Sequence, residues 1–159
     1  MIKPLFDADD AEWVTMVGRY MLNMGAVEFA TRLLIARIHG TDQVLIFSDD
    51  LAPRVAFLKS RFPREDLTRH SWAMNVLEVA TKHTTFRNTV AHCSIVLGED
   101  AQGTRRVVGL LDTRPKDKRL VAEIISIDEL KGRVDESAKV ARDILAMQAD
   151  FGATEQPGR

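Results

Sequence analysis

An unusually long helical pattern, over residues 9–39, is the feature that most constrains the fold of this chain. Apolar side chains recur there at spacings of three and four residues, which is the period of one face of an α-helix. The apolar positions of this pattern are Trp13, Met16, Val17, Tyr20, Met24, Val27 and Leu34. Asp9 or Asp10 can serve as the N-cap, and Gly40 supplies a stop signal. The sequence therefore predicts a long first helix.

Two glycines lie inside this predicted helix. Gly18 and Gly25 each weaken a helix interior by up to about 1 kcal/mol relative to alanine, so both need a packing reason. Close approach of another helix is the simplest reason. The helix also carries more apolar positions than one seam of a bundle requires. We therefore expect a homodimer with isologous symmetry.

Two further helical patterns follow. Residues 52–62 predict a short second helix, with Pro53 in its first turn and another proline directly after its end. Its apolar face is formed by Val55, Leu58 and Phe62. A third run begins near Asp66, a potential N-cap, and continues to His92, with Thr84-Thr85 as either a break or a weak spot.

The pattern then changes from helix to strand. Residues 94–97, 106–111 and 120–127 are rich in β-branched and aliphatic side chains, with turn residues at 98–103 and a polar loop at 114–118. These segments predict a small antiparallel β-hairpin, with room for a third strand.

A capping box, Ser126-Ile-Asp-Glu129, opens the last predicted helix, which extends to about Asp150. Its expected inward residues are Leu130, Val134, Ala138, Ala141 and Leu145. The whole pattern predicts a mainly α protein, a bundle of four or five helices with a small antiparallel β-hairpin inserted before the last helix. We expect one domain over residues 1–152 and a disordered tail over residues 153–159.

The composition is ordinary for a globular domain and excludes several classes of function. Hydrophobic residues make up 45% of the chain and charged residues 28%, with a formal net charge of -1. That charge argues against coating duplex DNA by bulk electrostatics, but it allows a local phosphate site. Cys93 is the single cysteine, so no intramolecular disulfide can form, and no Cys/His cluster predicts a zinc site. We expect no cofactor.

The sequence also shows no pattern typical of a secretory signal or a membrane span. The first ten residues have no apolar stretch of the kind that secretory signals carry, and no apolar run approaches the roughly 20 residues of a membrane span. We expect a cytoplasmic protein without a membrane partner.

The stretch from Phe86 to His92 carries the most chemistry. Asn88 follows Arg87 directly, and His92 comes four residues after Asn88. On a helix this spacing puts Asn88 and His92 on one face, with Arg87 about 100° from Asn88. An anion binder, a neutral donor and a titratable base are thereby gathered, as metal-independent cleavage of a phosphodiester requires. His83 lies about 180° from His92 on a continuous helix, and we expect it to be exposed.

This segment resembles the signature of the HEPN superfamily (higher eukaryotes and prokaryotes nucleotide-binding domains). The loose form of that signature, an arginine four to six residues before a histidine, is also met by Arg32 to His39 and Arg64 to His70. The tight form has asparagine directly after the arginine and a small residue before the histidine. Only Arg87 to His92 meets it.

The resemblance extends to the order of the elements and implies a fold and an activity. It implies an up-down helical bundle and a homodimer that brings two copies of the motif to one cleft. Many family members are metal-independent endoribonucleases. They are often toxins paired with a nucleotidyltransferase-type antitoxin, whereas others have lost catalysis and bind RNA or partners.

The residue types fit cleavage of RNA by its own 2′-OH. His92 is the candidate general base for the 2′-OH proton, and the Arg87 guanidinium offers a bidentate fork for the developing phosphorane charge. Asn88 adds a neutral donor, and Glu28, in mid-course of the first helix, is a candidate for orienting Arg87 or His92. The products would be a 2′,3′-cyclic phosphate and a 5′-OH.

Each of these four residues also has a structural alternative. His92 can be a structural or simply exposed histidine, and Arg87 can form a surface salt bridge with Glu78 or another acid. Asn88 can orient the histidine or cap a helix end, and Glu28 can be a surface acid or a buried ion-pair partner. The corresponding alternatives for the whole protein are a catalytically inactive HEPN-like binding or dimerisation module and a plain helical interaction module.

Overall fold

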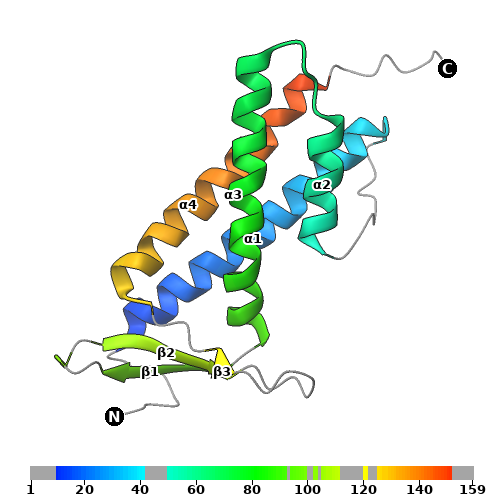
Figure 1. The fold of residues 1–159 in the computed structure, drawn as a ribbon. Helices are drawn as coiled ribbons and strands as arrows, with labels where there is room; N and C mark the ends of the chain where they lie inside the picture. Colours follow the sequence, from blue (N-terminus) through cyan, green and yellow to red (C-terminus); the bar gives the residue numbers. More distant parts are fainter. Residues whose placement is uncertain are drawn as a thin grey trace. The chain divides into compact units, whose positions relative to one another are not determined.

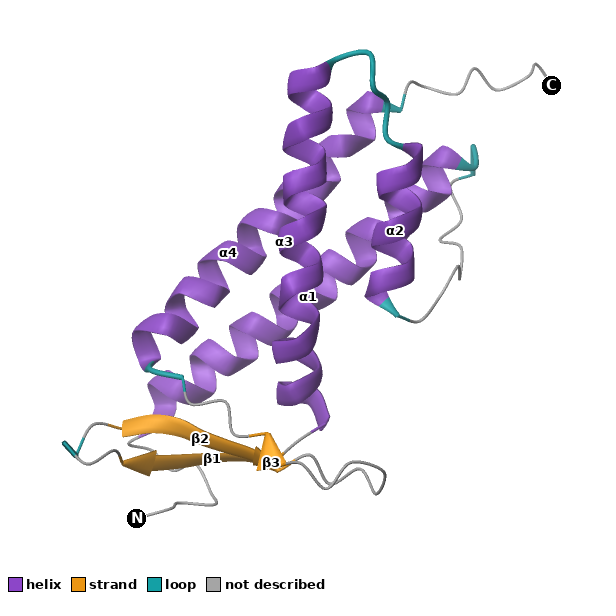
Figure 2. Ribbon diagram, in the orientation of Figure 1, coloured by secondary structure: helices purple, strands orange, loops and turns teal. Residues whose placement is uncertain are grey.

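A computed structural model shows that the protein is mainly helical, a helical bundle as the sequence predicts (Figures 1 and 2). The structure describes the ranges 10–41, 50–92, 94–99, 102–103, 105–111, 120–121 and 125–151. The predicted tail, 153–159, lies outside these ranges. None of the described helices is both long and apolar enough to cross a membrane.

The helices agree closely with their sequence patterns. Helix α1 spans Ala11–Ile38, α2 spans Leu51–Arg61, and α3 spans Leu67–His92. Helix α3 runs without a break, so Thr84 and Thr85 are helical residues. Helix α4 spans Ile127–Ala146 and continues as the 3-10 turn η2, Met147–Asp150.

The end of α1 shows why Gly40 works as a stop signal. Gly40 has φ 67°, in the left-handed region that side chains other than glycine rarely adopt. The Thr41 N–H donates to the Ala36 carbonyl at 3.0 Å, and the Gly40 N–H donates to the Arg37 carbonyl at 3.0 Å. These two bonds form a Schellman motif, which supplies donors to carbonyl groups that have no hydrogen-bond partner within the helix.

Two predicted helix starts are confirmed by their capping bonds. The carboxylate of Asp66 accepts a hydrogen bond from the Arg69 N–H at 2.9 Å, at the start of α3. Ser126 and Glu129 form the reciprocal capping box: the Ser126 N–H donates to Glu129 Oε2 at 2.6 Å, and the Glu129 N–H donates to Ser126 Oγ at 3.2 Å.

Along the chain, three strands follow α3 and precede α4. They form an antiparallel sheet in the order β1-β2-β3 (Figure 2). Strand β1 spans Ser94–Glu99, β2 spans Arg105–Leu111, and β3 spans Leu120–Val121. The register pairs Glu99 with Arg105 and Ser94 with Leu111, and a bulge lies between Ser94 and Val96. Strand β3 pairs with the end of β2.

By internal contacts the chain divides into two compact units. Unit 1 comprises Met1–Asn23 and Thr85–Glu136, and its core includes residues from the first half of α1, the end of α3 and the first half of α4. The buried apolar side chains of unit 1 are Trp13, Tyr20, Phe86, Ile125, Leu130 and Val134.

Unit 2 comprises Met24–Thr84 and Ser137–Arg159, and it contains all of α2. Its larger buried apolar side chains are Met24, Val27, Leu34, Ile35, Leu51, Val55, Leu58, Phe62, Val76, Leu77, Val140, Ile144 and Met147. The buried stripe of α4 passes through Val140, Ile144 and Met147, so Leu145, one position further round the helix, is 42% exposed. The expectation that Leu145 points inward was wrong for this reason.

Candidate functional site

The last turns of α3 hold the predicted motif, and Phe86 anchors them. The Phe86 side chain is buried, and its ring meets the Tyr20 ring edge-on, with 5.0 Å between centroids. The guanidinium of Arg133 lies 4.1 Å from the Phe86 ring centre, within cation–π range. These contacts hold the turn that precedes the motif against α1 and α4 within unit 1.

Arg87 and Asn88 lie side by side directly after this anchor. Arg87 Nη1 donates a hydrogen bond to Asn88 Oδ1 at 3.1 Å. Asn88 is exposed and Arg87 is half-buried, so the pair is open to solvent on one side. A guanidinium and a carboxamide therefore form one polar group, in which the amide NH₂ and the other guanidinium N–H groups are all donors.

His92 is the last residue of α3 and lies one turn beyond Asn88. On an α-helix, residues four apart share a face, so the backbone places His92 on the same side as Asn88. The His92 side chain lies outside the described residues. The backbone geometry alone therefore supports the predicted grouping of arginine, asparagine and histidine at the end of one helix.

Glu28, the fourth predicted site residue, lies in the middle of α1 and belongs to unit 2, whereas the motif belongs to unit 1. It is half-buried. Its backbone carbonyl accepts hydrogen bonds from Thr31 Oγ1 at 2.8 Å and from Arg54 Nη1 at 3.0 Å. Glu28 is thus part of the polar contacts within unit 2, and a role toward the motif stays a prediction.

Arg54 is a buried charged residue that sequence reasoning missed. It is fully buried, at 0% exposure, in α2. Its guanidinium donates to the Glu28 carbonyl at 3.0 Å, and its Nε donates to the Asp50 carbonyl at 3.2 Å. The signal was present, because Arg54 lies four residues before Leu58 and therefore on the apolar face of α2.

The expectation that His83 is exposed was also wrong. Its side chain is buried, with 4% exposure. It continues the buried stripe of α3 that runs through Leu77 and Ala80 and ends at Phe86. Successive members of that stripe are three residues apart, so each one is a neighbour of the next on the helix surface while the stripe winds around the helix. The expectation used only the angle between His83 and His92 and ignored this stripe.

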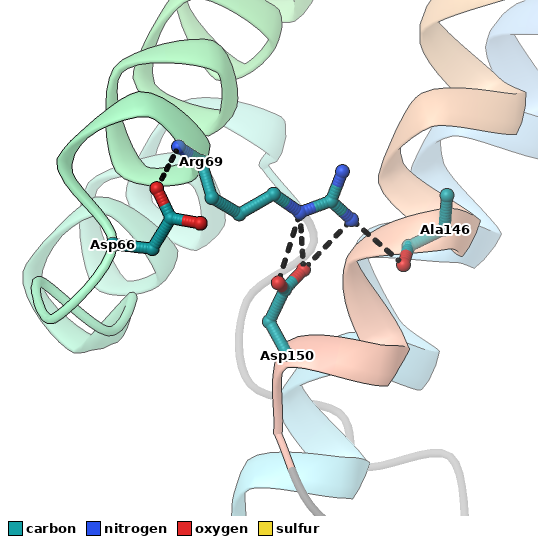
Figure 3. Close-up of polar contacts among 4 residues, drawn as sticks. All are labelled: Asp66, Arg69, Ala146 and Asp150. Carbon is teal, nitrogen blue, oxygen red and sulfur yellow. Dashed lines mark hydrogen bonds and ion pairs between the residues drawn. The ribbon is translucent and has the colours of Figure 1, made fainter.

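A second polar assembly joins α3 to η2 in unit 2 (Figure 3). Arg69 Nε donates to both carboxylate oxygens of Asp150, at 2.9 and 3.1 Å, and Arg69 Nη2 donates to Asp150 Oδ2 at 2.9 Å and to the Ala146 carbonyl at 3.2 Å. The guanidinium also lies 3.9 Å from the Trp72 ring centre. The hydrogen bond to Asp150 is the main cause that raises the pKa of Arg69 above its ordinary value.

We expect this assembly to stabilise the fold rather than carry chemistry. In a double-mutant cycle of Arg69→Ala and Asp150→Ala, the coupling free energy of unfolding should be about 1 kcal/mol, because the bidentate geometry is fixed by several bonds. The exposed pair Lys139–Asp143, at 2.6 Å along α4, is the matched control, with an expected coupling of about 0.3–0.5 kcal/mol. Urea unfolding of the six variants and the wild type measures both cycles. A coupling no larger than that of the control contradicts the assignment.

Comparisons with known proteins give no further guide to the site. No family model, no curated protein and no solved structure matches the chain. Among the described residues, no three His, Cys, Asp or Glu side chains gather closely enough to hold a metal ion. The candidate site therefore depends on the motif and its geometry.

Proposed function

We propose that this protein is a HEPN-like, metal-independent endoribonuclease of the toxin type that binds and cleaves RNA. The observation that supports this proposal most strongly is the contact between Arg87 and Asn88. Their 3.1 Å hydrogen bond holds a guanidinium and an amide together on an accessible surface, one helical turn before His92. Fixed donors beside a titratable base are what in-line attack by a 2′-OH needs.

In the proposed reaction, His92 removes the proton from the 2′-OH as its oxygen bonds to the adjacent phosphorus. The bond from phosphorus to the 5′ oxygen breaks, and the leaving oxygen takes up a proton from solvent water, which gives a 2′,3′-cyclic phosphate and a 5′-OH. Arg87 contacts two phosphate oxygens through its planar fork, and Asn88 adds a neutral donor. Glu28 is proposed as a positioning residue for this group.

The proposal includes the partners that the resemblance implies. The active form is a homodimer in which two copies of His92 line one cleft, RNA is the substrate, and a nucleotidyltransferase-type antitoxin restrains the activity in the cytoplasm. The helical bundle, together with its β-hairpin, supplies the scaffold that holds these site residues.

A binding module without catalysis is the second candidate function. The bond between Arg87 and Asn88 supports this alternative as well, because it gives both side chains a structural partner. Such a module would bind RNA or a second protein through the same surface and leave RNA intact.

Cleavage in the presence of a chelator separates the enzyme from other nucleases. The purified protein should cleave single-stranded RNA at an unchanged rate in excess EDTA, because the proposed groups need no metal. DNA of the same sequence should survive, because it lacks the 2′-OH nucleophile. Both are measured by gel with end-labelled oligonucleotides, and Glu65→Ala, which changes an exposed residue of unit 2, serves as a control protein preparation. Loss of cleavage in EDTA, or cleavage of DNA, contradicts the proposal.

A further inference from the structure

Unit 2 concentrates positive charge in two segments of the chain that contain no acidic residue. Residues 29–41 include the end of α1, and residues 51–64 include α2 and part of the loop after it. Neither segment has an Asp or a Glu, and their basic residues are Arg32, Arg37, Arg54, Lys59, Arg61 and Arg64. The formal net charge of the whole chain is -1, so this positive charge is a local feature of unit 2.

Three of these arginines surround Phe62, whose side chain is buried. The Arg37 Nε donates to the Phe151 carbonyl at 3.4 Å, and the Phe151 ring meets the Phe62 ring edge-on, with 5.5 Å between centroids. Arg61 directly precedes Phe62, and Arg64 follows it by two residues. We call Arg37, Arg61 and Arg64 the arginine cluster.

The guanidinium groups of the arginine cluster are accessible. Arg61 and Arg64 are exposed, and Arg37 is half-buried. Within the part of the chain that the structure describes, none of the three forms an ion pair. Lys59, in the same acid-free segment, is instead paired with Glu78. The charges of the cluster are therefore not neutralised by described acidic side chains.

Helix ends explain only part of this arrangement. Arg37 and Arg61 lie in the last turns of α1 and α2, where a cation stabilises a helix by about 0.3–1 kcal/mol through the helix dipole. Arg64 lies beyond the end of α2, where this effect gives no reason for a cation. The helix dipole also gives no reason for the lack of acids over the whole of residues 51–64.

We propose that the arginine cluster binds backbone phosphates of single-stranded RNA at a site separate from the motif. A guanidinium is planar and presents parallel N–H donors, so it matches two oxygens of one phosphate. A chain with a net charge of -1 has no general attraction for a polyanion, so a polyanionic substrate needs a local basic surface of this kind.

This inference rests on RNA being the substrate in the proposed function, but it does not depend on the chemistry at His92. The arginine cluster belongs to unit 2, whereas the motif belongs to unit 1. Binding of an RNA that cannot be cleaved by its own 2′-OH therefore tests the cluster, and the cleavage assay in EDTA tests the motif.

Fluorescence anisotropy with a labelled single-stranded 2′-O-methyl RNA measures the binding, in EDTA and at several salt concentrations. Arg61→Ala/Arg64→Ala should raise the dissociation constant at least roughly 10-fold relative to the wild type. The slope of log Kd against log salt concentration should fall by about 1.4, because each phosphate contact on a single strand contributes about 0.7. Arg61→Lys/Arg64→Lys should keep the wild-type slope, because it keeps both charges.

Lys139→Ala/Arg142→Ala is the matched control, because it also removes two exposed cations from unit 2. A weaker effect of this control on both the dissociation constant and the slope supports the arginine cluster as the site. An equal effect would show that only the total charge matters and would overturn the site. Unchanged binding by Arg61→Ala/Arg64→Ala would also overturn the site while leaving the proposed function in place. The unfolding temperature of each variant verifies that it is folded.

An acidic protein segment is the other class of ligand that a cluster of arginines could bind, and labelled poly-glutamate tests it in the same assay. Binding of the RNA in preference to poly-glutamate supports the proposal. Binding of poly-glutamate but not of the RNA, lost in Arg61→Ala/Arg64→Ala, would overturn it and make the cluster a site for an acidic protein. A wild type that binds neither probe would overturn the cluster as a binding site, and the cleavage assay in EDTA would still decide the enzyme.

Discussion

Replacing His92 by alanine is expected to lower the rate of RNA cleavage by about 10²- to 10⁴-fold, the usual contribution of a general base. The unfolding temperature should change little, because His92 is the last residue of α3. Without the imidazole, the 2′-OH proton has only water as its acceptor. Single-turnover cleavage of a labelled RNA oligonucleotide at fixed pH measures the effect.

The matched control is His39→Ala, which removes an exposed histidine that stacks on Phe57 in unit 2, at 5.7 Å between ring centroids. Its cleavage rate should equal that of the wild type. For the wild type the rate should rise from acidic to neutral pH, because a base must be unprotonated to accept a proton. Arg87→Lys should also impair cleavage, since a point charge does not reproduce the guanidinium fork. Equal rates for His92→Ala and His39→Ala would remove His92 from the mechanism.

Replacing Arg54 by alanine is expected to lower the free energy of unfolding by about 2–5 kcal/mol. The side chain is fully buried, so its removal leaves a cavity as well as two carbonyls that lose a donor. Thermal and urea unfolding measure the change. A loss below about 0.5 kcal/mol would mean that the site relaxes around the smaller residue and that Arg54 contributes nothing to the stability of unit 2.

Arg61→Ala is the matched control on the same helix. Arg61 is exposed, and its guanidinium lies 5.7 Å from the Phe57 ring centre, which is worth at most about 1 kcal/mol at an exposed site. Arg54→Met separates the two contributions of Arg54, because it keeps most of the volume and removes the donors. An intermediate loss for Arg54→Met is expected.

Local features of the fold were predictable because few residues determine them. Gly40 ends α1 through its own backbone conformation, and Ser126 and Glu129 begin α4 through bonds to each other. Arg87 and Asn88 were likewise expected to lie side by side. Consecutive residues of a helix are about 100° apart around its axis, so their long polar side chains can meet.

Features that depend on distant packing were not predictable from the same patterns. Arg54 is buried because α1 supplies the Glu28 carbonyl as an acceptor from 26 residues away. Whether the buried side of α3 includes His83 depends on which elements cover that side of the helix. The same holds for Leu145 on α4. The relation of Glu28 to the motif belongs to the same class, because the two lie far apart in the sequence and in different units.

Analysis of the RNA ends formed in EDTA tests the central claim most directly. Mass spectrometry of the products from the wild-type protein should show a 2′,3′-cyclic phosphate and a 5′-OH, and the same RNA incubated with His92→Ala should stay intact over the same time. Products with a 5′-phosphate, equal cleavage by His92→Ala, or RNA left untouched by the wild type would contradict the proposal of a metal-independent ribonuclease.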